Sequence, residues 1–451
     1  MSKKVAILTG EFGQGHLALA RKLQSHLDPL PSVDCVDIIN INRLVDEAVV
    51  VNSFWDRMRY SAHHQLMFSY DNFAKLPAWL RYLHPINLAS RWVKRFYAMI
   101  WGTASYLVYR KAELERLLQR FESYDCVFSV LATPNHLLWM LQRQLLLVNV
   151  SQDFGAGVRT VWWGRFWDFH LSSDSNNAFV ARSEYHSATK VLELGPLYHR
   201  LDHLSLDALS SSHSETRILF IPGKTGNQSA LLRRLLSIAK ACLARGHHVV
   251  WRGSEAVINE ELEHWDAFFQ QRITVQGYGP LDDLEQFDLV VGKGSYNQIT
   301  ESLIKGVPFA CVHFLGYWEK QNLCVQSIGV QLLDWSREYS IPQPEQLKKM
   351  RRVQLQLRDE LFSRPDEVAQ LLGQVVLSDK IVVPLSTPLP EPYLDFSGRR
   401  VASERTAFRR RVGIVIKKML LLPLLCIIYY STGWWRYLRL RKSRSFFSKE
   451  F

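Results

Sequence analysis

Short strand-like runs alternate with stretches of helical spacing along most of the chain. Residues 5–8 are wholly apolar, residues 9–16 form a glycine-rich turn, and residues 17–27 carry apolar side chains at helical spacing. A second strand-like run follows at residues 33–41. Short apolar runs of this kind are typical of strands in a parallel sheet that is covered on both faces. The pattern predicts a βαβ unit at the start of the chain.

The same rhythm continues and then restarts further along. Strand-like runs occupy residues 126–131, 145–150 and 191–194 in the first half. In the second half the expected strands are residues 217–221, 247–252, 273–276, 289–291 and 309–312, and the expected helices are residues 229–245 and 343–374. Strands that alternate with helices indicate an α/β fold with doubly wound parallel sheets, here in two halves.

A polar, serine-rich stretch separates the two halves. Residues 205–216 have the composition of an interdomain linker. The chain of 451 residues also exceeds the size of one ordinary core. The expected organisation is an N-terminal domain at 1–204, the linker at 205–216, a C-terminal domain at 217–375, a proline-rich connector at 376–395 and a tail at 396–451.

The net charge of +12 is concentrated at the end of the chain. Residues 396–451 hold 14 Lys or Arg and two Glu, so the first 395 residues sum to zero. A neutral body with a basic tail lacks the charge of a nucleic-acid-binding globule, and we expect no nucleic-acid partner. The six cysteines show no metal-binding or disulfide spacing, which favours a reducing, cytoplasmic compartment.

The basic tail contains an apolar run at residues 419–435. The run is shorter than the about 20 residues of a spanning helix, and Pro423 and Gly433 interrupt it. Its tyrosines and tryptophans suit the headgroup level of a bilayer. We expect a peripheral or monotopic anchor that lies on or re-enters an anionic membrane surface. A spanning helix and a helix packed on the body are the alternatives.

Two further features bear on membrane contact. Residues 54–109 contain 14 aromatic residues and an excess of Lys and Arg. This composition fits either a membrane-facing lobe or an ordinary aromatic core. The apolar run after the first four residues is too short for a cleavable signal. The protein is therefore expected at the cytoplasmic face of a membrane.

Glycine-rich turns follow the first strand of each half. In the first, Gly13, Gly15 and His16 precede a helix, and a helix N-terminus favours an anion. His16 is a candidate for proton transfer near neutral pH, or else a packing residue at the helix start. The second turn contains Gly223, Lys224, Thr225 and Gly226. It is a candidate phosphate-binding turn, or else a tight turn with a solvated lysine.

Further turns follow later strands of the second half. The residues of interest are Gly277 and Tyr278; Lys293, Gly294 and Ser295 with Glu301; Gly306 and Pro308; and Glu319 and Asn322. Together with the Gly-x-Gly-His turn, this ordered series resembles the GT-B glycosyltransferases. Within them it is most similar to the branch of diacylglycerol glycosyltransferases and of the lipid-linked N-acetylglucosamine transferase of peptidoglycan synthesis. The resemblance covers residues 4–335 and implies two Rossmann-like domains that face each other across a cleft.

The resemblance also implies roles for individual residues. Glu301 would bind the ribose of UDP, and the backbone near Gly277 and Tyr278 would meet the uracil. The turns with Gly223–Gly226 and Lys293–Ser295 would hold the diphosphate, and Glu319 and Asn322 the donor sugar. Gly13 and Gly15 belong to the acceptor-side loop, where His16, or else Asp153, would deprotonate the acceptor hydroxyl. Tyr296 and Asn297 depart from the usual small residues and are expected to add bulk beside the phosphates.

These features predict a membrane-associated glycosyltransferase. It would move a hexosyl or N-acetylhexosaminyl group from a UDP-sugar to a lipid or lipid-linked acceptor. Transfer would invert the anomeric carbon and need no metal or cofactor, because helix dipoles and lysines stabilise the leaving diphosphate. Two alternatives stay open: a UDP-sugar 2-epimerase of the same fold, and a non-catalytic nucleotide-sugar-binding protein at a membrane.

Overall fold

A computed structural model gives the arrangement of the chain. It describes residues 2–10, 14–48, 111–130, 145–151, 167–173, 177–178, 181–182, 189–197, 216–223, 229–277, 283–312, 330–335, 338–361 and 365–378. The aromatic segment at residues 54–109 and the basic tail at residues 396–451 lie outside these residues, and so do the predictions made for them. Within the described part of the chain, no helix has both the length and the apolar character needed to cross a bilayer.

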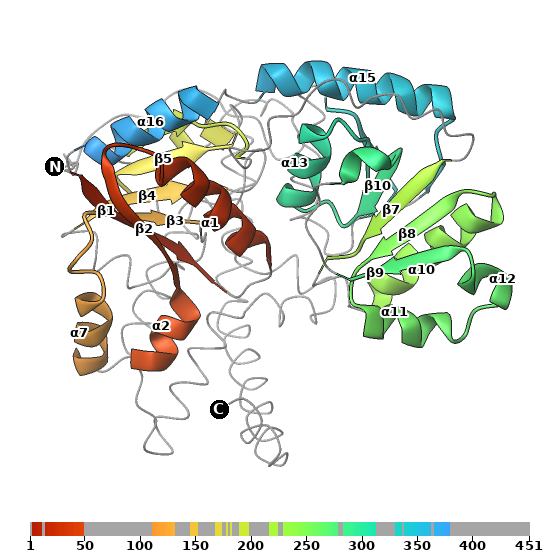
Figure 1. Cartoon of the computed structure of the whole chain (residues 1–451), viewed down its shortest axis with the longest axis horizontal. Helices are drawn as coiled ribbons and strands as arrows, with labels where there is room; N and C mark the ends of the chain where they lie inside the picture. The colour runs from red at the N-terminus through yellow and green to blue at the C-terminus, as the bar shows by residue number, and fades with distance from the viewer. Residues whose placement is uncertain are drawn as a thin grey trace, which may run out of the picture.

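Two six-stranded parallel sheets organise the structure (Figure 1). The first has the order β2-β1-β3-β4-β5-β6, and its hydrogen-bonded neighbours are all parallel. Its strands are β1 (Lys3–Thr9), β2 (Val33–Asn40), β3 (Cys126–Ser129), β4 (Leu146–Val150), β5 (Phe169–Ser172) and β6 (Lys190–Glu193). The predicted parallel sheet of the first half is confirmed.

The second sheet has the order β12-β11-β10-β7-β8-β9 and is also parallel throughout. Its strands are β7 (Arg217–Ile221), β8 (His248–Arg252), β9 (Ile273–Gln276), β10 (Leu289–Gly292), β11 (Phe309–Cys311) and β12 (Leu332–Asp334). The expectation of a second α/β half is confirmed as well.

Helices accompany both sheets. They are α1 (Gln14–Leu27), α2 (Ile41–Ala48), α7 (Lys111–Gln119), α10 (Ser229–Ala244), α11 (Glu255–Leu262), α12 (Ala267–Gln270), the 3₁₀ turn η5 (Leu284–Gln286), α13 (Tyr296–Ile304), α15 (Pro344–Leu361) and α16 (Pro365–Leu377). In β7, Ile218 and Phe220 pack into one buried cluster while Leu219 and Ile221 pack into another. Successive residues point to opposite faces of a strand, so both faces of the second sheet are covered, as the apolar runs predict.

The last described helix packs on the first half of the chain rather than on the second. Val368, Leu372, Val375 and Val376 of α16 belong to the core that contains strands β1 and β3 and helix α1. Figure 1 shows α15 beside the second sheet and α16 beside the first. The C-terminal domain was expected to span 217–375 and so to include most of α16. The helix packs on the first core instead, because its side chains at helical spacing form an apolar face that this core buries.

Two strands were not predicted. β5 contains His170, and a buried histidine interrupts the apolar run that would mark a strand. β12 has only three residues, fewer than a pattern can distinguish from a loop. Both extend their sheets by pairing with a neighbour that was predicted, β4 and β11 respectively.

Candidate active site

In each sheet the chain adds strands first on one side of the sheet's first strand and then on the other side. In the first sheet the chain places β2 on one side of β1 and β3 on the other. In the second sheet β8 lies on one side of β7 and β10 on the other. Doubly wound proteins bind ligands at the carboxyl ends of the strands beside such a reversal. The two predicted ligand-binding turns, residues 9–16 and 222–226, follow β1 and β7, and so lie at these places.

His16 lies in the first turn of α1 and is partly buried. Its Nδ1 is 3.0 Å from the backbone oxygen of Val130, which follows β3. A carbonyl oxygen only accepts hydrogen bonds, so Nδ1 carries the proton and donates it to this contact. A neutral His16 in this tautomer has its lone pair on Nε2, the form required of a general base.

The start of α13 lies at the reversal of the second sheet. Gln298 in its first turn donates from Nε2 to the backbone oxygen of Ile221 at the end of β7, over 2.7 Å. The other side of the same amide accepts from the backbone N–H of Ser295, over 3.3 Å. Gln298, which the sequence did not single out, thereby ties the helix start to the strand beside it.

This arrangement brings two of the predicted phosphate turns together. A Cβ added to Gly223 would lie 3.4 Å from Cε of Lys293, so the lysine stem lies against the turn that follows β7. Gly294 and Ser295 complete the turn between β10 and α13. A lysine and the N-terminus of a helix at one place form a positive environment that suits a diphosphate.

Glu301 lies further along α13 and contacts the first half of the chain. Its Oε1 is 2.9 Å from Nζ of Lys22 in α1, and the lysine side chain is 3% exposed while the glutamate side chain is 24% exposed. Four residues earlier on α13, Asn297 donates from Nδ2 to the backbone oxygen of Gly15 over 2.9 Å. Helix α1, which begins at the first glycine-rich turn, and helix α13, which begins after the turn of Lys293–Ser295, are therefore in direct contact.

The expectation for Tyr296 was wrong, and the one for Asn297 needs revision. Tyr296 is 5% exposed and packs in the core with Val290 and Phe309, so it adds no bulk beside a phosphate. Asn297 instead uses its amide on the Gly15 loop of the other half.

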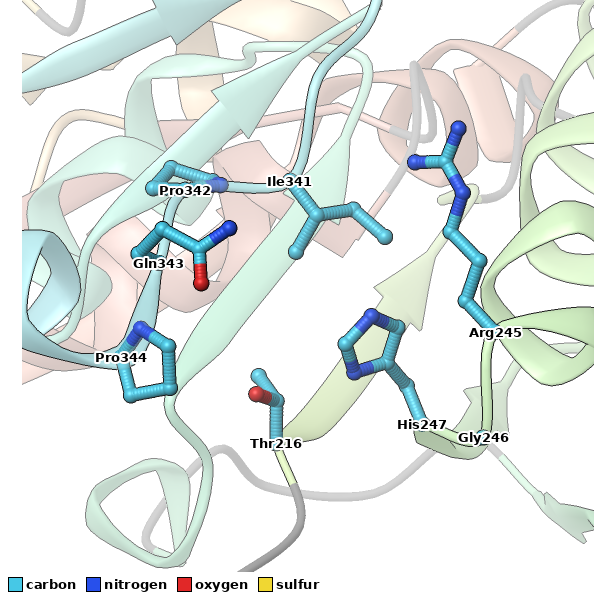
Figure 2. Close-up of a pocket in the computed structure, with 8 residues that line it drawn as sticks. All are labelled: Thr216, Arg245, Gly246, His247, Ile341, Pro342, Gln343 and Pro344. Carbon is cyan, nitrogen blue, oxygen red and sulfur yellow. The ribbon is translucent and has the colours of Figure 1, made fainter.

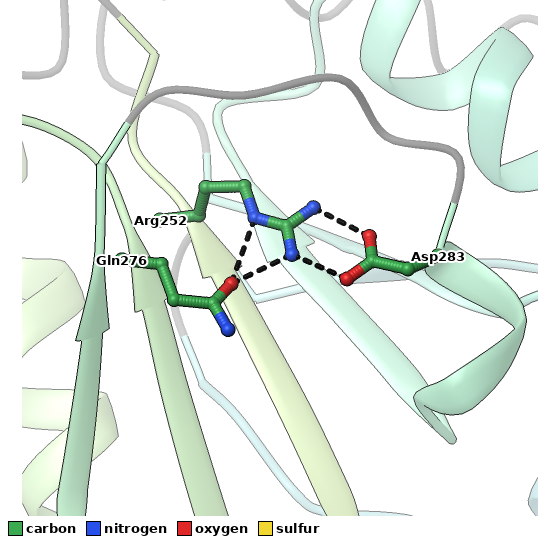
Figure 3. Close-up of polar contacts among 3 residues, drawn as sticks. All are labelled: Arg252, Gln276 and Asp283. Atoms are coloured by element: carbon green, nitrogen blue, oxygen red, sulfur yellow. Dashed lines mark hydrogen bonds and ion pairs between the residues drawn. The ribbon is translucent and has the colours of Figure 1, made fainter.

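Gly277 follows β9, beside a partly buried polar network drawn in Figure 3. Arg252, at the end of β8, donates to both carboxylate oxygens of Asp283 over 2.7 Å and to Oε1 of Gln276 over 3.1 and 2.6 Å. The hydrogen bond from Arg252 is the main reason that the pKa of Asp283 is lowered. Because Gln276 ends β9 and Asp283 precedes η5, the guanidinium joins the two ends of the segment that contains Tyr278.

We expect the substitution Arg252→Met to lower the free energy of unfolding by about 2 kcal/mol, because Asp283 and Gln276 lose their donor. The value lies below that of a fully buried pair, because the Asp283 side chain is 35% exposed and water can replace part of the interaction. Urea unfolding followed by circular dichroism measures the loss. Asp283→Asn, which keeps an acceptor, should lose less. Equal stability of Arg252→Met and the parent protein would contradict the role of this network.

A second polar network, fully buried, lies in the first half. His170 is fully buried, accepts at Nδ1 from Asn149 Nδ2 over 2.7 Å, and donates from Nε2 to Asn177 Oδ1 over 3.0 Å. Burial lowers the pKa of His170 to about 4. The imidazole is therefore neutral at physiological pH and, having no solvent contact, is a structural group.

This lowered pKa predicts a loss of stability in acid. His170 has an ordinary pKa of 6.5, so between pH 6.5 and 4 the unfolded chain binds a proton that the folded protein does not. The contribution is complete above pH 6.5 and is lost as the pH falls toward 4, by about 3 kcal/mol. Unfolding measured at several pH values gives the slope. His170→Gln, which can accept and donate in the same places, should flatten it; the same slope in both proteins would contradict this origin.

A cavity of about 490 Å³ lies at the amino ends of the strands of the second sheet (Figure 2). Its lining residues are Thr216, Arg245, Gly246, His247, Ile341, Pro342, Gln343 and Pro344. Burial, and next the charge of Arg245, lower the pKa of His247. Thr216 and His247 directly precede β7 and β8, so the cavity lies at the amino ends of the strands. It is therefore separate from the glycine turns at the carboxyl ends, where ligands of this class of fold bind.

Several predicted site residues lie outside the described part of the chain. They are Gly13, Asp153, Lys224, Thr225, Gly226, Tyr278, Glu319 and Asn322. Among the residues that the structure does describe, no group of three or more His, Cys, Asp or Glu is placed to hold a metal ion. Of the candidate bases, His16 is thus the one with a described geometry.

Several solved structures are similar to this chain. TcCGT1, crystallised in complex with UDP, matches with a TM-score of 0.50 at 12% identity, over 83% of this chain and 99% of that chain. The glycosyltransferase SnogD from Streptomyces nogalater matches with a TM-score of 0.48 at 16% identity, over 83% of this chain and 100% of that chain. MurG from Acinetobacter baumannii matches with a TM-score of 0.46 at 13% identity, over 83% of this chain and 100% of that chain.

No protein-family profile and no curated protein sequence matches the chain. At 12% identity, the likeness to TcCGT1 concerns the fold alone. Taken with the two parallel six-stranded sheets, it shows that the chain has the GT-B fold of two Rossmann-like domains.

Proposed function

We propose that the protein is a membrane-associated glycosyltransferase that moves a hexosyl or N-acetylhexosaminyl group from a UDP-sugar to a lipid or lipid-linked acceptor. The observation that carries this proposal is the contact between α1 and α13. Each helix begins at the place in its sheet where ligands bind, and Lys22–Glu301 and Asn297–Gly15 join them. A proton acceptor and an anion-binding turn on adjoining helices are the groups that transfer from a nucleotide sugar needs.

The donor would bind to the second half of the chain. The turn with Lys293, Gly294 and Ser295 faces the positive end of α13, which stabilises the diphosphate as it leaves. Glu301 would accept hydrogen bonds from the ribose hydroxyls, and the turn at Gly277 would meet the base. Lys224, Thr225, Gly226 and Tyr278 would complete these contacts, and Glu319 and Asn322 would contact the sugar.

The acceptor would bind to the first half. The hydrogen bond to Val130 favours the tautomer of His16 in which Nε2 accepts a proton. His16, with Asp153 as the other candidate, would then remove the proton of the acceptor hydroxyl as it attacks the anomeric carbon. The new glycosidic bond forms as the bond to the diphosphate breaks, so one displacement inverts that carbon. Charge on UDP is stabilised by the helix and lysines, and we propose no metal or other cofactor.

The lipid acceptor and the membrane are proposed from the tail. Its charge of +12 and its apolar run of residues 419–435 combine electrostatic attraction to anionic lipid with apolar insertion. The aromatic segment at residues 54–109 would add a second contact near the acceptor half. The cytoplasmic face follows, because it carries the anionic leaflet that attracts basic segments.

Product analysis tests this proposal. The full chain is incubated with UDP-glucose, UDP-galactose or UDP-N-acetylglucosamine, with and without vesicles of total membrane lipid. We expect UDP release and a new glycolipid only when lipid is present. A changed donor sugar without lipid would instead identify an epimerase, and UDP binding without any product would identify a non-catalytic binder.

A further inference from the structure

We propose that Lys22 is a positioning residue of the donor site, contributed by the opposite domain. It would hold the carboxylate of Glu301 so that the ribose hydroxyls of the nucleotide meet it in one orientation. This inference rests on the proposed function, since it concerns a nucleoside diphosphate bound at Glu301. None of the turns that suggested a glycosyltransferase includes Lys22.

The geometry places Lys22 and Glu301 in a paired contact between two helices. Gly15 and Lys22 are seven residues apart on α1, and Asn297 and Glu301 are four apart on α13, so each pair shares one face of its helix. Two polar contacts therefore connect the same two faces, one at the backbone of Gly15 and one at the side chain of Lys22. The two partners of the ion pair are 279 positions apart in the sequence.

Burial makes this contact specific. The Lys22 side chain is only 3% exposed, and a buried ammonium group is costly unless an acceptor faces it. Glu301 supplies that acceptor over 2.9 Å. In the surface ion pair Arg120–Glu47, by contrast, both side chains are more than half exposed, and water replaces much of the interaction.

The pair leaves part of the carboxylate available to a ligand. Lys22 contacts Oε1, a carboxylate accepts hydrogen bonds at both oxygens, and the Glu301 side chain is 24% exposed. A fixed Oε1 restricts the rotamers of Glu301, so less freedom is lost when Oε2 accepts from a ribose hydroxyl. Because Lys22 belongs to the helix that carries His16, the same contact connects donor binding with the acceptor half.

Titration calorimetry tests this role with two nucleotides, UDP and 2′,3′-dideoxy-UDP, which lacks both ribose hydroxyls of interest. The variant Lys22→Met keeps the length of the side chain and removes its charge. We expect it to weaken UDP binding by about tenfold and to leave the affinity for dideoxy-UDP unchanged. Lys22→Arg, which restores a charged donor, should recover most of the UDP affinity. Lys22→Gln serves as a second charge-removing variant if the methionine protein does not fold.

Lys305→Met is the matched control. Lys305 also forms a partly buried ion pair, 3.2 Å from Glu285, but within the second half. The Lys305→Met substitution should therefore leave the affinity for UDP unchanged. Unchanged or tighter UDP binding by Lys22→Met, or equal weakening of both nucleotides, would overturn the positioning role. Failure of the parent protein to bind UDP would overturn the proposed function and this inference with it, whereas UDP binding that is insensitive to Lys22 overturns the inference alone.

Discussion

Replacing His16 with alanine is expected to lower the rate of glycosyl transfer by about 10² to 10⁴-fold, the range for loss of a general base. The affinity for UDP should stay the same, because His16 lies on the acceptor half and contacts the carbonyl of Val130. Steady-state assays of UDP release, combined with calorimetric titration of UDP, separate the two effects.

A second variant distinguishes base catalysis from a packing role at the start of α1. His16→Gln can still donate a hydrogen bond to Val130, but it has no basic nitrogen. It should fold normally and transfer as slowly as His16→Ala. A normal rate in His16→Gln would reduce His16 to a packing residue and leave Asp153 as the candidate base.

Gly294→Ala is expected to have the largest effect on stability, a loss of about 3 kcal/mol or more. Gly294 has a φ of +76°, a backbone conformation that alanine adopts at a cost. An added Cβ would also collide with Sγ of Cys311, which is fully buried in the neighbouring strand β11. Because Gly294 sets the path of the turn into α13, UDP binding should fall together with the free energy of unfolding.

Gly246→Ala separates the two causes. Gly246 has a φ of +83°, but an added Cβ meets no atom within 4 Å. Its substitution should therefore cost only the backbone strain, about 1 kcal/mol. The double variant Gly294→Ala, Cys311→Ala should be more stable than the sum of the two single losses predicts. Strict additivity, or equal losses for Gly294→Ala and Gly246→Ala, would contradict the steric account.

Local pattern was sufficient for most of the fold. Strands β7 and β9 begin and end where the strand-like runs predicted, because a polar residue precedes each strand and Pro222 or Gly277 follows it. Where one helix was expected at 343–374, the described residues form two elements, α15, which ends at Leu361, and α16, which begins at Pro365. Which half α16 packs on could not be predicted, since an apolar helix face does not identify the core that buries it.

The candidate site was predicted residue by residue but not as an assembly. The turn residues Gly223 and Lys293 were expected to serve one ligand; the structure places the lysine stem against Gly223, and the shared role stays a prediction. The pairing of Lys22 with Glu301 depends on how two domains meet, and no local pattern encodes it. Arg252 was also missed, although an arginine that directly follows three apolar residues of a strand was a usable signal.

A crystal structure of the full chain with UDP tests most directly where the donor binds. We expect the diphosphate at the turn of Lys293, Gly294 and Ser295, the ribose hydroxyls within hydrogen-bonding distance of Glu301, and the uracil beside Gly277. A nucleotide bound elsewhere, such as in the cavity beside His247, or no bound nucleotide at saturating UDP, would contradict a donor site at the start of α13.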